Sequence, residues 1–308
     1  MGKMKKFGKR LWKDRALVLM SMPVVIYLVM FHFIPISGLV MAFKRFDFSL
    51  GMFKSPWCGL DNLRFLFLSG GTFWRITRNT VLYYIVFTIL GTICQVALAI
   101  AINELIYAKA GKLIQSTLIL PTFISYIAVS YVVSAFLAPN TGLLTKLISS
   151  ITGETILFYL ESKYWPFILT VVYLWKSVGY GSVIYLAVLS GIDQGLYEAA
   201  KLDGATTWQR IRYITVPMMT SMIVIRMLLG LAGIMHSDTG LFYQVTKNTG
   251  ALFETTQVLD SYLLNAIKGG TNFGPASAAT LYQSVIGCIL LLVVNGIVRK
   301  VSPEDALF

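Results

Sequence analysis

Long apolar runs separated by short polar segments dominate this chain. The runs cover residues 16–43, 80–103, 113–137, 165–189, 217–235 and 273–298, and their charged residues are confined to Lys176 and Arg226. About 20 apolar residues suffice for a helix to cross a bilayer. The pattern therefore predicts an all-α integral membrane protein with six transmembrane helices. Pro121 predicts a kink in the third, and residues 254–267 have the pattern of an amphipathic helix at the outer interface.

A polar segment between the fourth and fifth runs has the signals of two short helices. Asp193 is a suitable N-cap for a helix over residues 194–202, because its carboxylate can accept hydrogen bonds from the first turn. Gly204 can end that helix in the left-handed conformation. Thr206 and Gln209 have the spacing of a capping box, which predicts a second helix at once. The expected product is a helix, a sharp turn and a helix.

One face of the first short helix is predicted to be accessible and to carry small side chains. Leu196, Ala199, Ala200 and Asp203 recur at helical spacing, and the two alanines allow a groove of another protein to approach closely. By periodicity alone, this is an amphipathic linker between membrane helices. The full spacing, from Glu198-Ala199-Ala200 through Gly204 to Ile214-Thr215-Val216-Pro217, resembles the "EAA" loop of bacterial ABC-importer permeases. Val216 stands where that family more often has Leu.

The resemblance implies the type I, maltose-type permease fold with a cytoplasmic coupling helix. The residues expected to contact an ATPase are Leu196, Glu198, Ala199, Ala200, Asp203 and Gly204. The implied partners are a second permease, two ATPase subunits that carry ATP and Mg, and an extracytoplasmic solute-binding protein. No cofactor is expected on this chain. The runs Gly59-Leu60-Asp61-Asn62 and Val258-Leu259-Asp260, with Asn272-Phe273, resemble the complex-oligosaccharide subfamily, which implies an oligosaccharide substrate.

Composition supports a membrane protein. Of 308 residues, 56% are hydrophobic and 13% are charged, and the mean hydropathy is +0.71, which exceeds what a soluble core requires. The net charge of +12 raises the possibility of nucleic-acid binding. The basic residues are scattered around the apolar runs rather than gathered on one soluble face, so we set nucleic acid aside.

The sequence offers little material for catalysis or metal binding. Cys58, Cys94 and Cys288 lie far apart, and His32 and His236 are isolated. The phosphate-binding GxxxxGK[ST] motif is absent, so ATP would have to bind another chain. A secondary transporter would need buried ionisable residues, and the runs contain no carboxylate. A membrane enzyme would need a catalytic constellation, and none is visible. An importer of another substrate class stays open.

Charge near the N-terminus predicts the orientation. Residues 1–15 include seven Lys and Arg, and the uncharged run that follows is longer than the core of a signal peptide. By the positive-inside rule this basic arm is cytoplasmic, which places both termini and the loop 190–217 on the inner side of a bacterial plasma membrane. We divide the chain into the arm, a first helix with an external segment (16–79), a permease core (80–300) and a cytoplasmic tail (301–308).

The fourth run suggests where a substrate would pass. Tyr173, Lys176 and Tyr180 fall on one broad helical face, and Tyr126 and Tyr131 of the third run are candidates for the opposite wall. Tyrosine rings and cationic donors suit sugars. The structural alternative, which we favour, is that Lys176 pairs with a helix C-terminus or a neighbouring carbonyl. For Arg226 we likewise prefer a packing or gating role.

Overall fold

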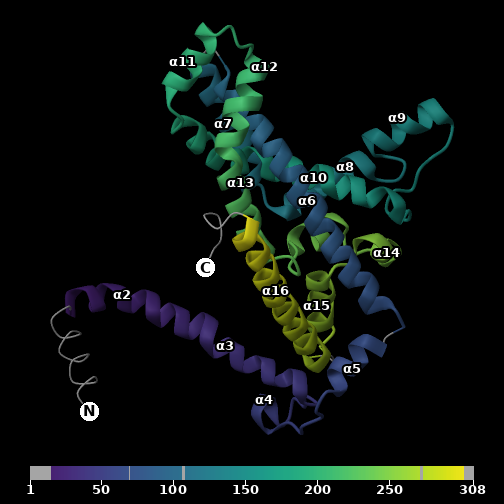
Figure 1. The fold of residues 1–308 in the computed structure, drawn as a ribbon. Helices are drawn as coiled ribbons and strands as arrows, with labels where there is room; N and C mark the ends of the chain where they lie inside the picture. Colours follow the sequence, from purple (N-terminus) through teal and green to yellow (C-terminus); the bar gives the residue numbers. More distant parts are fainter. Residues whose placement is uncertain (1–14, 69, 106–107, 271–272, 302–308) are drawn as a thin grey trace. The chain divides into compact units, whose positions relative to one another are not determined.

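The computed structural model describes residues 15–68, 70–105, 108–270 and 273–301. Two compact units make up the chain, one from residues up to 68 together with 269–281, and one from 69–268 together with 282 onward. Figure 1 shows that the described chain is built almost wholly of helices. Five of them are long and apolar enough to cross a membrane, or six if one bent pair counts as a single span. This is the predicted all-α membrane architecture.

The first unit contains the first span and the segment predicted to be external. A continuous helical stretch, Arg15–Phe43, includes α2 (Arg15–Leu28), α3 (Ile34–Ile36) and a final tight stretch Ser37–Phe43. Two short helices follow, α4 (Gly51–Lys54) and α5 (Asp61–Leu68). The Asn62 amide donates to the carbonyls of Ala42 (3.0 Å) and Lys44 (2.9 Å). A side chain of this segment therefore supplies hydrogen bonds to backbone carbonyls at the end of the first span.

The second unit is centred on two long helices. They are α6 (Thr72–Asn103) and α10 (Trp165–Ser190), which pack against each other. α10 also packs on α7 (Ala108–Phe123). The two backbones are so close at Gly179 that a β-carbon there would lie 1.8 Å from the Leu118 carbonyl oxygen. Glycine thus permits the close approach of the two backbones. A buried cluster around Tyr83, Trp165 and Leu169 fills the interior.

The third apolar run is not one kinked helix. It consists of α7 and α8 (Tyr126–Leu137), which meet at an angle of 97°. Pro121 removes one backbone donor, but the break comes at Ile124 and Ser125, where extended Ser125 accepts from the Ala128 amide and caps the new helix. The predicted kink at Pro121 is therefore replaced by a break a few residues later. α9 (Leu143–Thr152) follows α8.

The fifth span begins earlier than the apolar run suggested. α12 (Thr207–Arg210), a π-helical turn (Ile211–Thr215) and α13 (Val216–Leu231) form one apolar helical stretch from Thr207 to Leu231. The last span, α16 (Phe273–Val301), begins where the sequence predicted it. Hydropathy alone placed the start of the fifth span near Pro217 because the turn between Thr207 and Thr215 still carries polar residues.

The segment predicted as one amphipathic helix over 254–267 is broken and packed inside. It forms α14 (Phe253–Thr256) and α15 (Leu259–Lys268), with Val258 and Leu259 fully buried between them. The Asn79 amide donates to the Glu254 and Gln257 carbonyls, and Thr80 Oγ1 accepts from the Leu259 amide at 2.9 Å. These bonds from α6 hold the break, so the expectation of one continuous helix was wrong, whereas its place at the outer interface stays a prediction.

Candidate functional site

The short helix before the fifth span has the predicted caps. α11 (Gln194–Leu202) begins at Asp193, whose Oδ1 accepts from the Gly195 amide at 2.9 Å. Gly204 has a φ of +79° and turns the chain. Thr206 and Gln209 then form a reciprocal capping box that starts α12. In Figure 1, α11 and α12 lie together at one end of the second unit.

The predicted face of α11 is open. Leu196, Glu198, Ala199 and Asp203 are exposed, and Ala200 is half-buried. The glycine turn at Gly204 is exposed as well. All six residues expected to contact an ATPase therefore remain accessible or partly accessible on one short element. Because the two alanines have small side chains, the backbone of this helix can be approached closely.

The opposite side of α11 is anchored by Tyr197, to which the sequence analysis gave no role. This ring is buried in a cluster with Ala99 of α6, Tyr185 of α10 and Met219 of α13. Its hydroxyl lies 2.9 Å from Thr215 Oγ1. α11 is thus fixed to three long helices through one side chain. The available signal was an aromatic residue on the side away from the small alanines.

A second connection joins the helical turn to α6. Arg210 of α12 lies 3.8 Å from the Glu104 carboxylate at the C-terminal end of α6, and both side chains are largely buried. A partly buried ion pair is costly to break, because each charge would be left without its partner. The pair therefore links α12 to the end of α6.

Lys176 lies at the break between α7 and α8. Its side chain is 9% exposed, and Nζ donates to the carbonyls of Pro121 (3.1 Å), Thr122 (2.7 Å) and Ile124. The Thr122 hydroxyl donates in return to the Lys176 carbonyl at 2.7 Å. Pro121 and Thr122 belong to the last turn of α7, and Ile124 lies just beyond it in the break. The Pro121 carbonyl also accepts from the Ile124 amide at 3.2 Å. Carbonyls at a helix C-terminus lack the partners that the next turn would supply. The geometry is the carbonyl pairing that we preferred over sugar contact.

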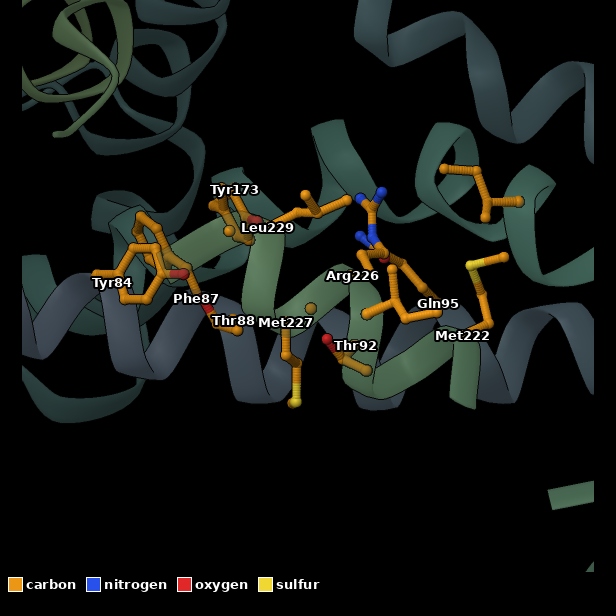
Figure 2. Close-up of a pocket in the computed structure, with 14 residues that line it drawn as sticks. Tyr84, Phe87, Thr88, Thr92, Gln95, Tyr173, Met222, Arg226, Met227 and Leu229 are labelled. Carbon is orange, nitrogen blue, oxygen red and sulfur yellow. The ribbon is translucent and has the colours of Figure 1, made fainter. Parts of the chain in front are cut away.

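Two adjoining cavities open in the second unit among α6, α8, α10 and α13. One, of about 560 Å³, is lined by Lys176, Tyr126, Tyr180, Ser177 and Asp238; the other, of about 480 Å³, is lined by Tyr84, Phe87, Thr88, Thr92 and Met222. Gln95, Tyr173 and Arg226 line both. Figure 2 shows Gln95, Tyr173 and Arg226 among the residues of the second cavity. The cavities therefore share one wall that carries polar groups.

The structure brings four of the five pathway candidates together. Tyr126, Tyr173, Lys176 and Tyr180 line the cavities, and the Tyr173 ring stacks on Phe87 at 4.1 Å. Tyr131 is 70% exposed and belongs to neither lining, because the break before α8 turns that helix away from the course of a straight third span. Sequence reasoning missed Gln95, although an amide in an uncharged run was a visible signal.

The loop that supplies Asp238 is held by a second carboxylate. Asp260 of α15 accepts from the Ser237 amide at 2.5 Å and hydroxyl at 3.0 Å, and lies 3.6 Å from His236. Burial raises the pKa of Asp260, but the hydrogen bonds from His236, Ser237 and Gln283 outweigh it and hold the pKa below its ordinary value. The hydrogen bond to Asp260 raises the pKa of His236. Asp238 Oδ1 in turn accepts from the Gly240 amide at 2.8 Å.

Residues 95–303 match the protein family described as "Binding-protein-dependent transport system inner membrane component". The chain belongs to this family. The match covers α11, the last span and the cavity-lining residues from Gln95 onward, whereas Tyr84, Phe87, Thr88, Gly91 and Thr92 of one cavity precede it. The resemblance to the EAA-loop permeases is thereby confirmed.

Individual relatives extend the match over nearly the whole permease. The chain is 29% identical to Protein LplB of Bacillus subtilis (strain 168), over 95% of this chain and 91% of that protein. It is 28% identical to the polygalacturonan/rhamnogalacturonan transport system permease protein YteP of the same organism, over 98% and 93%. It is similar to a chain in the crystal structure of a bacterial ABC transporter involved in the import of the acidic polysaccharide alginate, with a TM-score of 0.86 and 29% identity, over 96% and 99% of the two chains.

These matches and the fold give the class of function. The permease is a membrane-embedded subunit of a binding-protein-dependent ABC importer and has the type I importer fold. A related crystal structure is of the alginate transporter in complex with a pentasaccharide-bound periplasmic protein, which is consistent with the predicted extracytoplasmic partner. Within the described residues there is no cluster of three or more His, Cys, Asp or Glu suited to a metal ion.

Proposed function

We propose that this permease forms a translocation pathway for oligosaccharides and that α11 couples it to ATP hydrolysis on separate subunits. The observation that carries the proposal is the position of α11, with an exposed small-residue face and a buried tyrosine anchor on the helices that line the cavities. One element can therefore contact a partner and move the pathway walls.

The coupling half of the proposal follows from mechanical continuity. An ATPase bound to Ala199, Ala200 and Asp203 displaces α11, and Tyr197 with the Arg210–Glu104 pair carries that displacement to α6, α10 and α13. Packed helices respond by rigid-body rocking rather than by bending, because interiors are close-packed. We propose that Glu198 pairs with a basic group on the ATPase and that Gly204 aims the helix.

The oligosaccharide half rests on the lining and on the relatives. Aromatic rings and polar groups both line the cavities, which provides flat apolar faces and hydrogen-bonding groups for a sugar ring. Names of similar proteins include polygalacturonan/rhamnogalacturonan and lactose transport permeases. We propose Tyr126, Tyr173 and Tyr180 as lining residues of the pathway, with Lys176 holding the α7–α8 break in place.

The proposed assembly contains a second permease and two ATPase subunits that bind ATP and Mg. An external binding protein delivers the substrate. We place both termini and α11 on the cytoplasmic side, in keeping with the basic N-terminal arm. Energy then comes from the partner ATPase, and this chain supplies the pathway and the coupling surface.

The test is transport by the reconstituted complex with a panel of oligosaccharides. The wild-type complex should import an oligosaccharide only with ATP and the binding protein. Glu198→Ala and Gly204→Val should insert and assemble but lose substrate-stimulated ATP hydrolysis by about tenfold or more, since 1.4 kcal/mol of lost coupling corresponds to a factor of ten. Valine is a poor fit at the positive φ of position 204.

The matched control is Lys201→Ala, an exposed position of α11 outside the predicted contact face. Its transport should equal that of the wild type. Uptake by this chain in vesicles without any ATPase would instead support a secondary transporter. Normal coupling by Glu198→Ala would leave that carboxylate as a helix-supporting residue only.

A further inference from the structure

Three charged side chains line the two adjoining cavities, and their charges do not sum to zero. Lys176 and Asp238 line one cavity and attract each other, and the Lys176 ammonium is also held by three backbone carbonyls. Asp238 is further engaged by the Gly240 and Leu241 amides. Arg226, which lines both cavities, leaves the shared wall with one uncompensated positive charge.

Arg226 has no anionic partner among the described residues. The ion pairs of that part of the chain join Lys163 to Glu161, Arg210 to Glu104 and His236 to Asp260, and no hydrogen bond of the Arg226 guanidinium to a described residue occurs. The side chain is half-buried within the apolar span Thr207–Leu231. A cation in a span is costly unless it faces a partner or water, so it marks a functional position.

Gln95 is a second polar group on the same wall without a partner in the described chain. Its side chain is 4% exposed and lies against Gly181, where a β-carbon would come within 2.3 Å of the amide. A buried amide ordinarily forms hydrogen bonds. Gln95 and Arg226 both line both cavities, and Figure 2 shows the two labelled side chains in the pocket view. Their donors are thus available to one ligand.

We infer that Arg226, with Gln95 beside it, binds the carboxylate of an acidic oligosaccharide as it crosses the membrane. This inference rests on the proposed function and specifies its substrate class as uronate-containing. A planar guanidinium binds a carboxylate through two parallel hydrogen bonds. The stacked Tyr173 and Phe87 rings offer an apolar surface next to that point. The cavity of about 480 Å³ falls within the usual size of ligand pockets, roughly 300–1,000 Å³.

A single carboxylate fits this wall better than a more highly charged anion. The Lys176 ammonium is committed to the α7 carbonyls, so Arg226 is the one cation of the linings left to receive a negative charge within the described chain. A phosphate dianion would keep part of its charge uncompensated in a low-dielectric environment. A monoanionic sugar acid is neutralised by one guanidinium.

The experiment measures equilibrium binding to the complete complex in lipid nanodiscs, without the binding protein, so that the specificity of that protein does not contribute. The probes are a radiolabelled tetragalacturonate and the same oligosaccharide with its carboxyl groups reduced to primary alcohols. We expect the wild-type complex to bind the acidic form about 10- to 100-fold more tightly, the factor that a charged hydrogen-bonded contact supplies. Arg226→Gln should remove this preference by weakening the acidic form alone.

Two further variants make the result specific. Arg226→Lys keeps the charge and should retain part of the preference, since one bidentate contact is replaced by a point charge. Lys163→Gln removes a positive charge from the exposed Lys163–Glu161 pair and should bind both probes as the wild type does. Transport of both probes with the binding protein present repeats the comparison under turnover.

The outcomes are distinct. Equal affinity of the wild-type complex for the two probes, or equal loss of both in Arg226→Gln, overturns the inference while leaving oligosaccharide import intact. Failure of the Arg226→Gln chain to hold the second permease shows that a carboxylate of that subunit is the partner, and also overturns it. A wild-type complex that imports neither probe nor any neutral oligosaccharide with ATP overturns the proposed function itself.

Discussion

Lys176 shows how an ammonium is accommodated inside an apolar helix. Three carbonyls at the end of α7 surround it, and the Tyr126 ring lies 4.9 Å from Nζ. The broken helix gains the donors that its last turn lacks, and the ammonium gains acceptors that replace water. The ammonium and the carbonyls thus offset each other's desolvation cost. This explains how a cation can lie far from both ends of a span.

We predict that Lys176→Met destabilises the fold and lowers transport of every oligosaccharide by the same factor. Each carbonyl left without a donor costs about 1–3 kcal/mol. Thermal unfolding of the purified complex, measured beside uptake of several oligosaccharides, checks this. Lys163→Met is the matched control, because that side chain is exposed and surface pairs contribute about 0–1 kcal/mol. A change of selectivity at unchanged thermal stability would contradict the capping role.

Gly179 is required by the contact between α7 and α10. Its missing side chain leaves room for the Leu118 carbonyl, which a β-carbon would approach to 1.8 Å. We predict that Gly179→Ala lowers the free energy of unfolding by at least about 1–3 kcal/mol, the usual cost of overpacking, because backbone rather than a flexible side chain must move. Thermal unfolding of the complex measures the loss.

The control for this substitution is Gly296→Ala in α16. No atom of the described chain lies within 4 Å of a β-carbon there, and the residue is exposed. Alanine has the higher helix propensity, so this variant should unfold at the same temperature as the wild type or slightly above it. Equal destabilisation by the two alanines would show that the α7–α10 approach is not the cause.

The element that we propose for coupling is α11, and its two sides differ. The exposed side presents Ala199 and Ala200, and the buried side inserts Tyr197 among α6, α10 and α13. A surface helix of nine residues has too few internal hydrogen bonds to be stable alone. The cap at Asp193 and the tyrosine anchor therefore keep it helical and oriented.

Tyr197→Phe should uncouple the transporter without unfolding it. The variant loses the hydroxyl contact with Thr215, worth about 1 kcal/mol, while the ring still fills its cluster. We expect substrate-stimulated ATP hydrolysis to fall about fivefold, with assembly retained. Tyr213→Phe is the matched control, because Tyr213 is exposed two residues from Thr215. An effect of the same size in the control would remove the anchor from the coupling path.

At the scale of the whole molecule, the spans and the basic arm predict a topology with α11 on the cytoplasmic side. We predict that a cysteine at Gln209 stays unlabelled by a membrane-impermeant thiol reagent in intact cells and reacts after permeabilisation. A cysteine at Ser49 of the external segment should react in both cases. Both positions are exposed, and both variants are made in a chain whose Cys58, Cys94 and Cys288 are replaced by serine. Labelling at position 209 in intact cells would reverse the orientation.

Predictability from sequence differed between the coupling element and the cavities. Asp193, Gly204, Thr206 and Gln209 act through neighbours within four residues, so the bounds of α11 and the start of α12 were predicted as observed. Three cavity positions, Tyr173, Lys176 and Tyr180, were found from helical spacing within one span, and Tyr126 was proposed from the third run. Tyr131 was placed in the cavity wall by mistake, because the direction of α8 depends on its 97° angle to α7. Gln95 was missed, because its place in the wall depends on how α6 packs on α10.

The sequence by itself determined the helical class, the membrane location and the capped turn, because hydropathy over about 20 residues and capping over four are local properties of the chain. The break between α7 and α8, the burial of α14 and α15 and the shared cavity wall were decided by tertiary structure. In each case the deciding hydrogen bond or contact joins residues more than fifty positions apart, as Lys176 with Pro121 and Asn79 with Gln257. Such pairs leave no periodic trace, since their geometry exists only after the helices have packed.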